Sequence, residues 1–265
     1  MKRNALTECA LWRAESGAVA DWPAMRHCDS LSADEIRVWR ACLDLHVRSV
    51  DRLAGLLSDE ERDRAQRFRF QRDVTRFVVS RAALRTGLAW CLGVEPERIA
   101  IRYGAHGKPE LATPFDRSGL QFNMSHAEGV ALGAVTRGRR VGVDIERLRS
   151  LDDLDALAER AFAPAERQAL RGLPSSQRLE GFFNCWTRKE AYVKAVGAGL
   201  GELLTGFTVS FVPGAPARLV HVDGDPEAPD RWSLAALEPA PGCVAAIAVE
   251  GRPARLECYT WVPAT

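Results

Sequence analysis

The sequence predicts an α/β (α+β) protein made of two pseudo-symmetric α/β lobes, and three observations lead to this prediction. The chain has 265 residues, which is enough for two lobes of about 120–130 residues each. Segments with the alternation of strands lie on both sides of long helical regions. The sequence also repeats itself weakly, because a helix start at 58–62 is echoed at 163–167 and the apolar run 130–135 is echoed at 244–249. We therefore divide the chain into a leader, an N-terminal lobe and a C-terminal lobe, at residues 1–33, 34–138 and 139–265.

In the first lobe, apolar side chains with a period of two predict a strand over 35–46. Ser58 and Glu61 form a capping box, because each side chain can satisfy an amide at the start of a helix. A helical region is predicted from there to about residue 92, where Gly93 ends it. Short strands are predicted over 99–103 and 129–135, while 107–109 and 122–126 are interpreted as turns.

The second lobe opens with a short strand over 141–145. Two or three helices are predicted over 151–196, followed by Gly197, Gly199 and Gly201. The rest of the chain is predicted to form strands with turns between them, at 206–212, 217–222, 231–237, 243–249 and 255–262.

Composition and charge exclude several classes of protein. With 46% hydrophobic and 27% charged residues, the chain is neither disordered nor fibrous. The longest apolar or small stretch, 242–249, is far shorter than the roughly 20 residues of a membrane helix, so no membrane partner is predicted. A net charge of +1 gives no electrostatic case for binding nucleic acid. The seven cysteines form no CxxC pair, which indicates reduced thiols and a cytoplasmic protein.

Two carboxylates lie close together in the segment Val141-Gly-Val-Asp144-Ile-Glu146. In a strand, side chains two positions apart point to the same face, so Asp144 and Glu146 are expected side by side. Such a pair repels unless a cation or a proton lies between the two groups. The alternative is that both are ordinary acids at the solvent-facing end of a strand.

A second polar motif is Trp186-Thr-Arg-Lys-Glu190-Ala-Tyr-Val-Lys194. Residues four apart share one face of a helix, so Trp186, Glu190 and Lys194 form one stripe. The alternative is a surface ion pair, worth only about 0.2–0.5 kcal/mol. Together with Asp144 and Glu146, Glu190 offers a third hard oxygen ligand, and such a set suits Mg²⁺ better than zinc.

Other polar residues are candidate ligands for an anion. The predicted turn with Ser125 and His126 offers suitable donors, although a plain hairpin turn is the alternative. A Ser–His nucleophile pair is disfavoured, because adjacent residues in a turn seldom point at each other. Arginines are in surplus between residues 58 and 85. Most are expected to be solvated, and one or two could reach a phosphate between the lobes.

These motifs, in this order, resemble the 4′-phosphopantetheinyl transferases of the long, two-lobed type that activates surfactin synthetase (the Sfp type). The resemblance extends from about residue 58 to residue 201. Glu61 departs from it, since some relatives carry a basic residue there, and no phosphate contact is expected at that position. The motifs that carry the resemblance are Arg67-Phe68 with Arg76, Arg81 and Leu84-Arg85, then Gly107-Lys-Pro109, Asn123-Met-Ser-His126, Gly142-Val-Asp-Ile-Glu146 and Trp186-Thr-Arg-Lys-Glu-Ala-Tyr-Val-Lys194.

The resemblance implies an enzyme with the 4′-phosphopantetheinyl transferase fold and its cofactor at the lobe interface. The implied reaction moves the 4′-phosphopantetheine moiety of coenzyme A to a serine of an apo acyl or peptidyl carrier protein and releases 3′,5′-ADP. It implies dependence on Mg²⁺, with Mn²⁺ as an alternative, held by Asp144, Glu146 and Glu190. The implied catalytic residues are Glu190, as the base, Lys194 and Asp144. The implied contacts of coenzyme A are Arg64, Arg76, Lys108, Pro109, Ser125, His126 and Lys194.

Two further points follow from the resemblance and its alternatives. The short holo-acyl-carrier-protein synthases assemble a similar site between subunits, whereas the internal repeat here predicts a site within one chain and hence a monomer. The competing hypothesis is a non-catalytic module on the same fold that binds a carrier protein or coenzyme A. Retention of three carboxylates and Lys194 disfavours that module. A phosphotransferase that uses a nucleoside triphosphate is disfavoured because the sequence has no Walker-type glycine loop.

Overall fold

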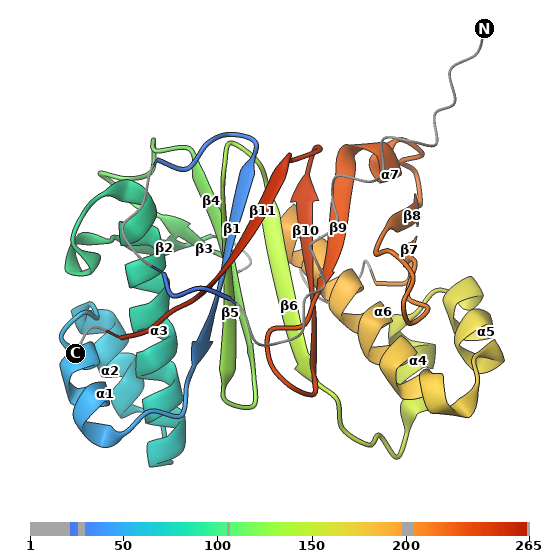
Figure 1. Cartoon of the computed structure of the whole chain (residues 1–265), viewed down its shortest axis with the longest axis horizontal. Coiled ribbons are helices and arrows are strands. Elements are labelled where there is room, and N and C mark those ends of the chain that lie inside the picture. The colour runs from blue at the N-terminus through green and yellow to red at the C-terminus, as the bar shows by residue number, and fades with distance from the viewer. Residues whose placement is uncertain (1–21, 26–29, 105–106, 198–203, 264–265) are drawn as a thin grey trace, which may run out of the picture.

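The computed structural model describes residues 22–25, 30–104, 107–197 and 204–263, which form layers of helices and sheets (Figure 1). The elements up to the middle of the chain are β1 (Glu35–Cys42), α1 (Val47–Ala54), α2 (Asp59–Gln66), α3 (Gln71–Leu92), β2 (Ile101–Tyr103), β3 (Pro109–Leu111), β4 (Leu120–Ala127), β5 (Val130–Arg137) and β6 (Val141–Arg147). The later elements are α4 (Leu154–Ala161), α5 (Pro164–Gly172), α6 (Ser175–Val196), β7 (Phe207–Val209), β8 (Leu219–Val222), α7 (Ala228–Arg231), β9 (Trp232–Leu237), β10 (Cys243–Glu250) and β11 (Arg255–Thr260).

Two sheets form the centre of the molecule. The first has the strand order β11-β1-β5-β4, and the second has the order β6-β10-β9. A shared apolar core, which includes Ile36, Leu132, Val143 and Ile247, lies between the two sheets. The long helices α3 and α6 cover the two outer faces (Figure 1). Because β5 and β10 are therefore buried on both faces, their sequences are nearly continuous apolar runs.

The two lobes repeat one arrangement. The strand order β1-β5-β4 in the first sheet corresponds to β6-β10-β9 in the second. Helices α3 and α6 both have 22 residues, and each is followed by a glycine with positive φ, Gly93 at 66° and Gly197 at 78°. In the preceding helix of each lobe, a glutamate accepts from the N-cap amide, Glu61 in α2 and Glu166 in α5. The weak repeat in the sequence corresponds to this repeat in three dimensions.

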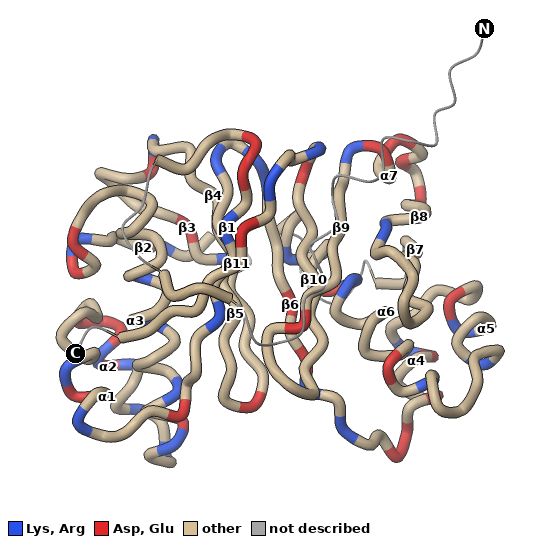
Figure 2. The backbone as a smooth tube through the Cα atoms, in the orientation of Figure 1, with Lys and Arg blue, Asp and Glu red and all other residues tan. Residues whose placement is uncertain are grey.

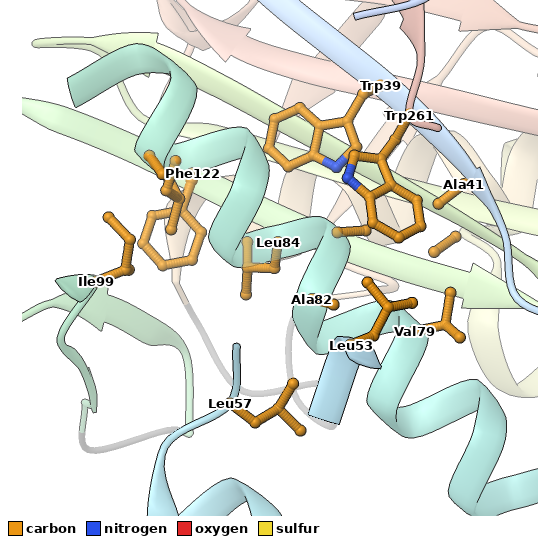
Figure 3. Close-up of a cluster of buried hydrophobic side chains, with 14 of the residues drawn as sticks. Trp39, Ala41, Leu53, Leu57, Val79, Ala82, Leu84, Ile99, Phe122 and Trp261 are labelled. Carbon is orange, nitrogen blue, oxygen red and sulfur yellow. The ribbon is translucent and has the colours of Figure 1, made fainter. Parts of the chain in front are cut away.

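The core of the first lobe lies between α3 and the first sheet (Figure 3). Trp39 is fully buried there, and its indole lies against Gly87 of α3 and Gly133 of β5. A Cβ would lie 2.7 Å from this ring at Gly87 and 2.3 Å from it at Gly133. Both positions therefore require glycine, because real Cβ atoms do not approach a ring so closely.

The C-terminal strand lies in the first sheet, although we assigned it from the sequence to the second lobe. β11 pairs with β1 in parallel, from Glu35 with Arg255 to Arg40 with Thr260. Trp261, directly after β11, is buried in the core of the first lobe (Figure 3). The alternation of apolar and polar residues along a strand shows which side chains face the core. It does not show which neighbouring strand that strand pairs with.

Three local predictions need correction. Residues 122–126 belong to β4 and are not a turn; the turn follows at Gly129, which has a φ of 90°. The single predicted helical region is two helices, with a break at 67–70. The first strand ends at Cys42, and helix α1, which we did not predict, follows it. The turn was predicted because polar residues such as those at alternate positions of β4 also favour turns.

Parts of two predictions lie outside the described residues, namely residues 1–21 and 26–29 of the leader and the glycines at 199 and 201. Within the described part of the leader, Leu31 is buried in the first core, and Ala24 forms a parallel bridge with Thr260. No helix in the described ranges is long and apolar enough to cross a membrane.

Candidate active site

Strand β6 carries Asp144 and Glu146 on the face that α6 covers. Val143 and Ile145 alternate with them and are buried between the two sheets. Asp144 is only 5% exposed, while Glu146 is partly exposed. As strand periodicity predicts, the two carboxylates share one face. Figure 2 shows acidic segments of β6, coloured red, near the middle of the molecule.

Helix α6 comes close to β6 because Gly142 has no side chain. A Cβ at Gly142 would lie 2.2 Å from the carbonyl oxygen of Ala191. That oxygen is a backbone atom, so it cannot move aside as the end of a flexible side chain can. The close approach brings Glu190 and Lys194, one turn apart on α6, up to Asp144.

Lys194 and Ser125 both contact one oxygen of Asp144. Lys194 Nζ is 2.6 Å from Asp144 Oδ1 and 3.0 Å from Ser125 Oγ. The Ser125 hydroxyl donates to the same Oδ1 over 2.9 Å. The other oxygen, Oδ2, is buried and has no hydrogen-bond partner among the described residues. A buried oxygen in this state costs free energy unless a donor or a cation is supplied.

The edges of the two sheets meet where β4 lies beside β6. Asn123 Oδ1 accepts from the backbone N–H of Val143 over 2.9 Å, so a side chain of one sheet satisfies a buried amide of the other. Ser125, two residues further along β4, points the same way and reaches Asp144. This role of Asn123 was not predicted from the sequence, although apolar and polar residues alternate over 122–125 as they do in a strand.

Asp144, Glu146, Glu190 and Lys194 form what we call the carboxylate cluster. Burial and the negative charges of Asp144 and Glu146 raise the pKa of Glu190 to about 7. Burial also raises the pKa of Asp144, and burial with the charge of Asp144 raises the pKa of Glu146. Lys194 acts in the opposite direction on all three groups. Arg149, 3.3 Å from Glu146, also lowers the pKa of that group. The three carboxylates still exceed these two positive charges.

A hard divalent cation suits this cluster chemically. Mg²⁺ prefers carboxylate oxygens and keeps several waters, so it needs few protein ligands. Such an ion would partner Oδ2 of Asp144 and offset the repulsion that raises the pKa values of Glu146 and Glu190. The described residues contain no group of three or more His, Cys, Asp or Glu side chains arranged to hold a metal ion by themselves. Lys194 is the cation that contacts Asp144 in this structure.

Lys108 contacts the C-terminal end of α6 from the first lobe. Its Nζ donates to the carbonyl oxygens of Lys194, over 2.8 Å, and of Ala195, over 3.3 Å. Burial lowers the pKa of Lys108. Gly107 before it has a φ of 73°, and Pro109 after it begins β3. A cation at these unpaired carbonyls is favoured by the helix dipole, and it joins the first lobe to α6.

Comparison with known proteins identifies the family. Residues 140–248 match the model of the 4′-phosphopantetheinyl transferase superfamily, and residues 46–137 match that of the 4′-phosphopantetheinyl transferase, N-terminal. The 4′-phosphopantetheinyl transferase HetI of Nostoc sp. is 42% identical over 222 residues, which are 84% of this chain and 90% of that protein. The chain belongs to the 4′-phosphopantetheinyl transferase superfamily.

Two further relatives agree with this assignment. The 4′-phosphopantetheinyl transferase psf-1 of Bacillus pumilus is 31% identical over 193 residues, covering 73% of this chain and 79% of its own. The 4′-phosphopantetheinyl transferase of Bacillus subtilis is 30% identical over 159 residues, covering 60% and 68%. The family resemblance seen in the sequence is confirmed, as are the α/β class and the enzymatic activity, transfer of phosphopantetheine from coenzyme A to carrier proteins.

In this transferase, His126 lies on the opposite face of β4 from Ser125. Met124, on the same face as His126, packs into the core beneath α3, with its Sδ 3.6 Å from Ser80 Oγ. The His126 side chain is exposed. Adjacent side chains diverge in a strand, so Ser125 joins the carboxylate cluster while His126 faces the α3 side.

The predicted arginine ligands lie on α2 and α3. Arg76 makes two charge-assisted hydrogen bonds to Asp44, Nε to Oδ1 at 2.7 Å and Nη2 to Oδ2 at 2.9 Å. Arg64 is exposed, with its guanidinium carbon 5.5 Å from the ring centroid of Phe77. The structure brings neither arginine into the carboxylate cluster.

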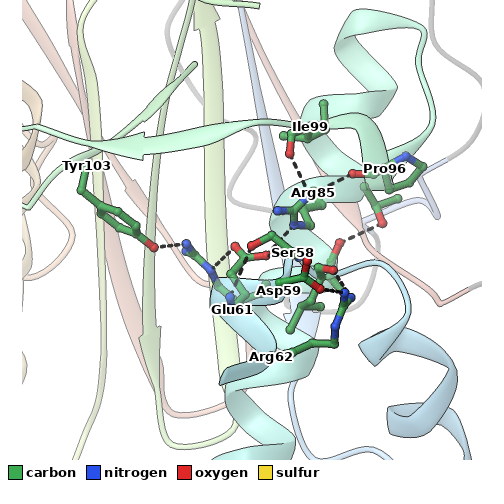
Figure 4. A network of polar contacts seen from close by, with 12 residues as sticks. Ser58, Asp59, Glu61, Arg62, Arg85, Pro96, Ile99 and Tyr103 are labelled. Carbon is green, nitrogen blue, oxygen red and sulfur yellow. Dashed lines mark hydrogen bonds and ion pairs between the residues drawn. The ribbon is translucent and has the colours of Figure 1, made fainter. Parts of the chain in front are cut away.

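Two other arginines of α3 are structural. Arg81 and Arg85 pair with buried Glu61, at 2.9 and 2.6 Å, and Arg81 also contacts the Tyr103 hydroxyl (Figure 4). Burial acts to raise the pKa of Glu61, but these two charges and the amide of Ser58 hold it below its usual value. The expectation that most arginines here are solvated is wrong for this pair. Glu61 therefore joins α2 to α3.

Proposed function

We propose that this transferase acts through the carboxylate cluster, with Asp144, Glu190 and Lys194 as its catalytic residues. The observation that carries the proposal is the state of Asp144, because one oxygen is paired with Lys194 and the other is buried without a partner among the described residues. Three carboxylates lie near Lys194, and of these Glu146 also pairs with Arg149, so negative charge is in excess. This excess supports a site for a cation together with the phosphates that the cation accompanies.

Mg²⁺, or Mn²⁺ in its place, is the ion that we assign to Asp144, Glu146 and Glu190. When bound, such an ion neutralises charge on a diphosphate and on the transition state of phosphoryl transfer. Lys194 supplies a further positive charge, one turn of α6 from Glu190, for the diphosphate of coenzyme A.

Glu190 is the residue that we assign as the base. Its pKa is about 7 without a bound ion, and a cation at the cluster would lower this pKa, so Glu190 would be ionised at neutral pH and able to accept the proton of the carrier serine hydroxyl. The serine oxygen forms a bond to the phosphorus that carries the pantetheine arm, and the bond from this phosphorus to the ADP portion breaks. The electron pair of that bond leaves with 3′,5′-ADP. Since the enzyme itself forms no covalent bond to the substrate in this step, positioning and charge neutralisation account for catalysis.

For the remainder of coenzyme A we propose contacts on both faces of β4. Ser125 lies on the face of β4 that we assign to the diphosphate, where its hydroxyl forms hydrogen bonds with Asp144 and Lys194. His126 and Arg76 lie on the α3 side, which suits the separate 3′-phosphate, and Arg76 would exchange Asp44 for that phosphate. The full proposed set is Arg64, Arg76, Lys108, Pro109, Ser125, His126 and Lys194.

Action as a monomer in the cytoplasm completes the proposal. Ser125 comes from the first lobe and Asp144 from the second, so one chain supplies both sides of the cluster. We place the boundary between the two lobes near residue 139, and we assign β11 to the first lobe. The seven scattered cysteines, which form no CxxC pair, support a reducing compartment. The partners are coenzyme A and an apo acyl or peptidyl carrier protein, without nucleic acid or membrane.

The proposal is tested by incubating the purified chain with coenzyme A, Mg²⁺ and a panel of apo carrier domains, each measured by intact mass. We expect at least one carrier to gain the mass of phosphopantetheine. EDTA should stop the reaction, and added Mg²⁺ or Mn²⁺ should restore it. Full conversion in EDTA would contradict the metal assignment, and a folded protein that modifies no carrier would contradict the function.

A further inference from the structure

A second ion pair lies on α6, one residue from Glu190, and it is almost completely buried. Lys189 Nζ is 2.7 Å from Glu166 Oε2, and the two side chains are 1% and 2% exposed. Lys189 also donates to the carbonyl oxygen of Phe207, over 2.5 Å, and lies 4.2 Å from the centroid of its ring. This pair lies outside the carboxylate cluster, so the proposed chemistry does not use it.

Glu166 joins three elements. Its Oε2 accepts from the N-cap amide of Ala163, over 2.9 Å, and its Oε1 accepts from the amide of Val209, over 2.8 Å. Through Lys189, the same carboxylate binds the second half of α6. The start of α5, helix α6 and strand β7 are therefore held by one buried group whose two oxygens both have partners.

A buried ion pair of this kind is not needed for stability alone. Apolar residues of similar volume often stabilise a core as well or better, because the two charges need not be desolvated. The hydrogen bonds of the pair are directional, however, so they fix the rotation and the axial position of α6. Successive residues of a helix point about 100° apart. A helix rotation that directs Lys189 to α5 and β7 directs Glu190 away from them.

The first lobe contains a corresponding buried ion pair, but no carboxylate cluster lies beside it. Arg85 has the same position in α3 as Lys189 has in α6, and it pairs with the capping-box residue Glu61 at 2.6 Å. Arg85 likewise donates to a backbone carbonyl beyond its helix, that of Ile99, over 2.8 Å (Figure 4). The residue after Arg85 is Thr86, whose hydroxyl bonds a carbonyl of its own helix. This pair therefore serves as a matched control.

We propose that Lys189, held by Glu166, is a positioning residue for the transfer reaction: it sets the rotation of α6 and so places Glu190 and Lys194 opposite Asp144. The inference rests on the proposed function of the carboxylate cluster. Lys189 is buried among protein groups, so it acts through Glu190 and Lys194 and does not touch the substrate.

The test compares Lys189→Met with Arg85→Met. Each variant leaves a buried glutamate with one partner fewer, so both should unfold at a lower temperature than the wild type. Only Lys189→Met should lower kcat, by roughly 10- to 100-fold, because a misplacement of about 1 Å can cost about that much. Only Lys189→Met should also weaken the binding of Mn²⁺ to the free protein, measured by titration calorimetry.

Three further results decide between positioning and simple destabilisation. Unchanged kcat and Mn²⁺ affinity in Lys189→Met would overturn the proposal, and so would an equal loss of both in Arg85→Met. Lys189→Arg keeps the charge and the donors, so it should retain most of the kcat that Lys189→Met loses. If Lys189→Met does not fold, the double variant Glu166→Gln with Lys189→Met removes both charges, and the same kcat and Mn²⁺ criteria apply to it.

The failure of this proposal can be told apart from the failure of the proposed function. If the wild type modifies no carrier, the assigned reaction is wrong. The Mn²⁺ titrations need neither coenzyme A nor a carrier, so the comparison of Lys189→Met with Arg85→Met still tests whether the buried pair positions the carboxylates.

Discussion

At the scale of single residues, the site depends on Asp144. Its Oδ1 receives hydrogen bonds from Lys194 and Ser125, whereas its buried Oδ2 has no partner among the described residues. A buried polar atom in this state costs on the order of 1–3 kcal/mol. The cation that we propose for this site would offset this cost.

Asp144→Asn should therefore stop transfer and leave the fold intact. The amide has the same size, but it removes the charge that pairs with Lys194 and that we assign to Mg²⁺, so we expect a loss of about 100-fold or more in rate. The measurement is the intact mass of the carrier over time, with circular dichroism as the check on folding. The control is Asp152→Asn, an exposed acid of the same lobe. Undiminished conversion by Asp144→Asn would refute the site.

The pKa of Glu190 predicts a pH dependence of stability in the metal-free protein. Its pKa is raised from 4.5 to about 7 by burial and by Asp144, so between these values the folded chain binds a proton that the unfolded chain has released. By linkage, the free energy of unfolding should fall as pH rises from about 4.5 to 7 and then level off. Urea unfolding in EDTA across this range measures the effect. Glu190→Gln should flatten the profile, and an identical slope in both proteins would contradict the assignment.

His126 and Arg76 predict how the transferase distinguishes coenzyme A from its dephosphorylated form. A charge-assisted hydrogen bond to the 3′-phosphate is worth roughly 1.5–3 kcal/mol, or about ten- to hundredfold in affinity. Dephospho-coenzyme A should therefore bind the wild type more weakly by that factor. His126→Ala and Arg76→Ala should each lose much of the difference, measured by titration calorimetry. Discrimination that is equal in all three proteins would show that these residues serve another role.

At the scale of elements, the site depends on how closely α6 lies on β6. Gly142 permits this contact, and the Asn123 side chain joins the edge of β6 to β4. Lys108 fixes the end of α6 from the first lobe. These three contacts come from three different segments, and each acts on the placement of the same few side chains.

Gly142→Ala should consequently impair the enzyme more than an ordinary glycine substitution. The new Cβ would lie 2.2 Å from a backbone oxygen of α6, so the helix must move away from Asp144. We expect a loss of roughly 100-fold in kcat, the cost of a displacement of about 1 Å. Gly172→Ala is the matched control, because a Cβ there would meet no described atom within 4 Å apart from its chain neighbours and the backbone of its own helix. Equal kcat in the two variants would contradict this account of the contact.

At the scale of the whole molecule, the chain closes on itself. β11 follows the last strand of the second sheet in the chain, but it pairs in parallel with β1 of the first sheet. Trp261, directly after β11, is buried in the core of the first lobe. β11 and Trp261 therefore stabilise the first lobe. β11 and the contact of β4 with β6 therefore join the two lobes, in addition to the shared apolar core and the contact of Lys108 with α6.

Trp261→Ala should destabilise the first lobe although the residue lies near the end of the chain. Trp261 is 4% exposed, and the loss of a buried Trp costs about 3–5 kcal/mol of unfolding free energy. Urea unfolding followed by circular dichroism measures this loss. Val262→Ala, at a side chain that is 60% exposed, should change stability little. A similar, small effect of both variants would mean that the C-terminal end is not part of the core.

Local features of this protein could be predicted from the sequence because they depend on spacing along the chain. The capping box of Ser58 and Glu61, the glycine end of α3 and the shared face of Asp144 and Glu146 are all of this kind. The order of the motifs also carried the family, which the comparisons confirm. The weak repeat correctly indicated two lobes of similar construction.

Only the tertiary structure decided which of these residues meet. Alternation does not say beside which strand an edge strand pairs, so β11 could not be placed. Asn123 and Ser125 looked like turn residues, but they lie in β4, which pairs with β5. Their side chains are satisfied there because β6 supplies their partners, Val143 and Asp144. The contacts of Lys108 with α6 and of Lys189 with Glu166 likewise join distant segments. Each of these contacts forms because packing buries a polar group beside a partner from another segment. The spacing of residues along the chain does not specify such a partner.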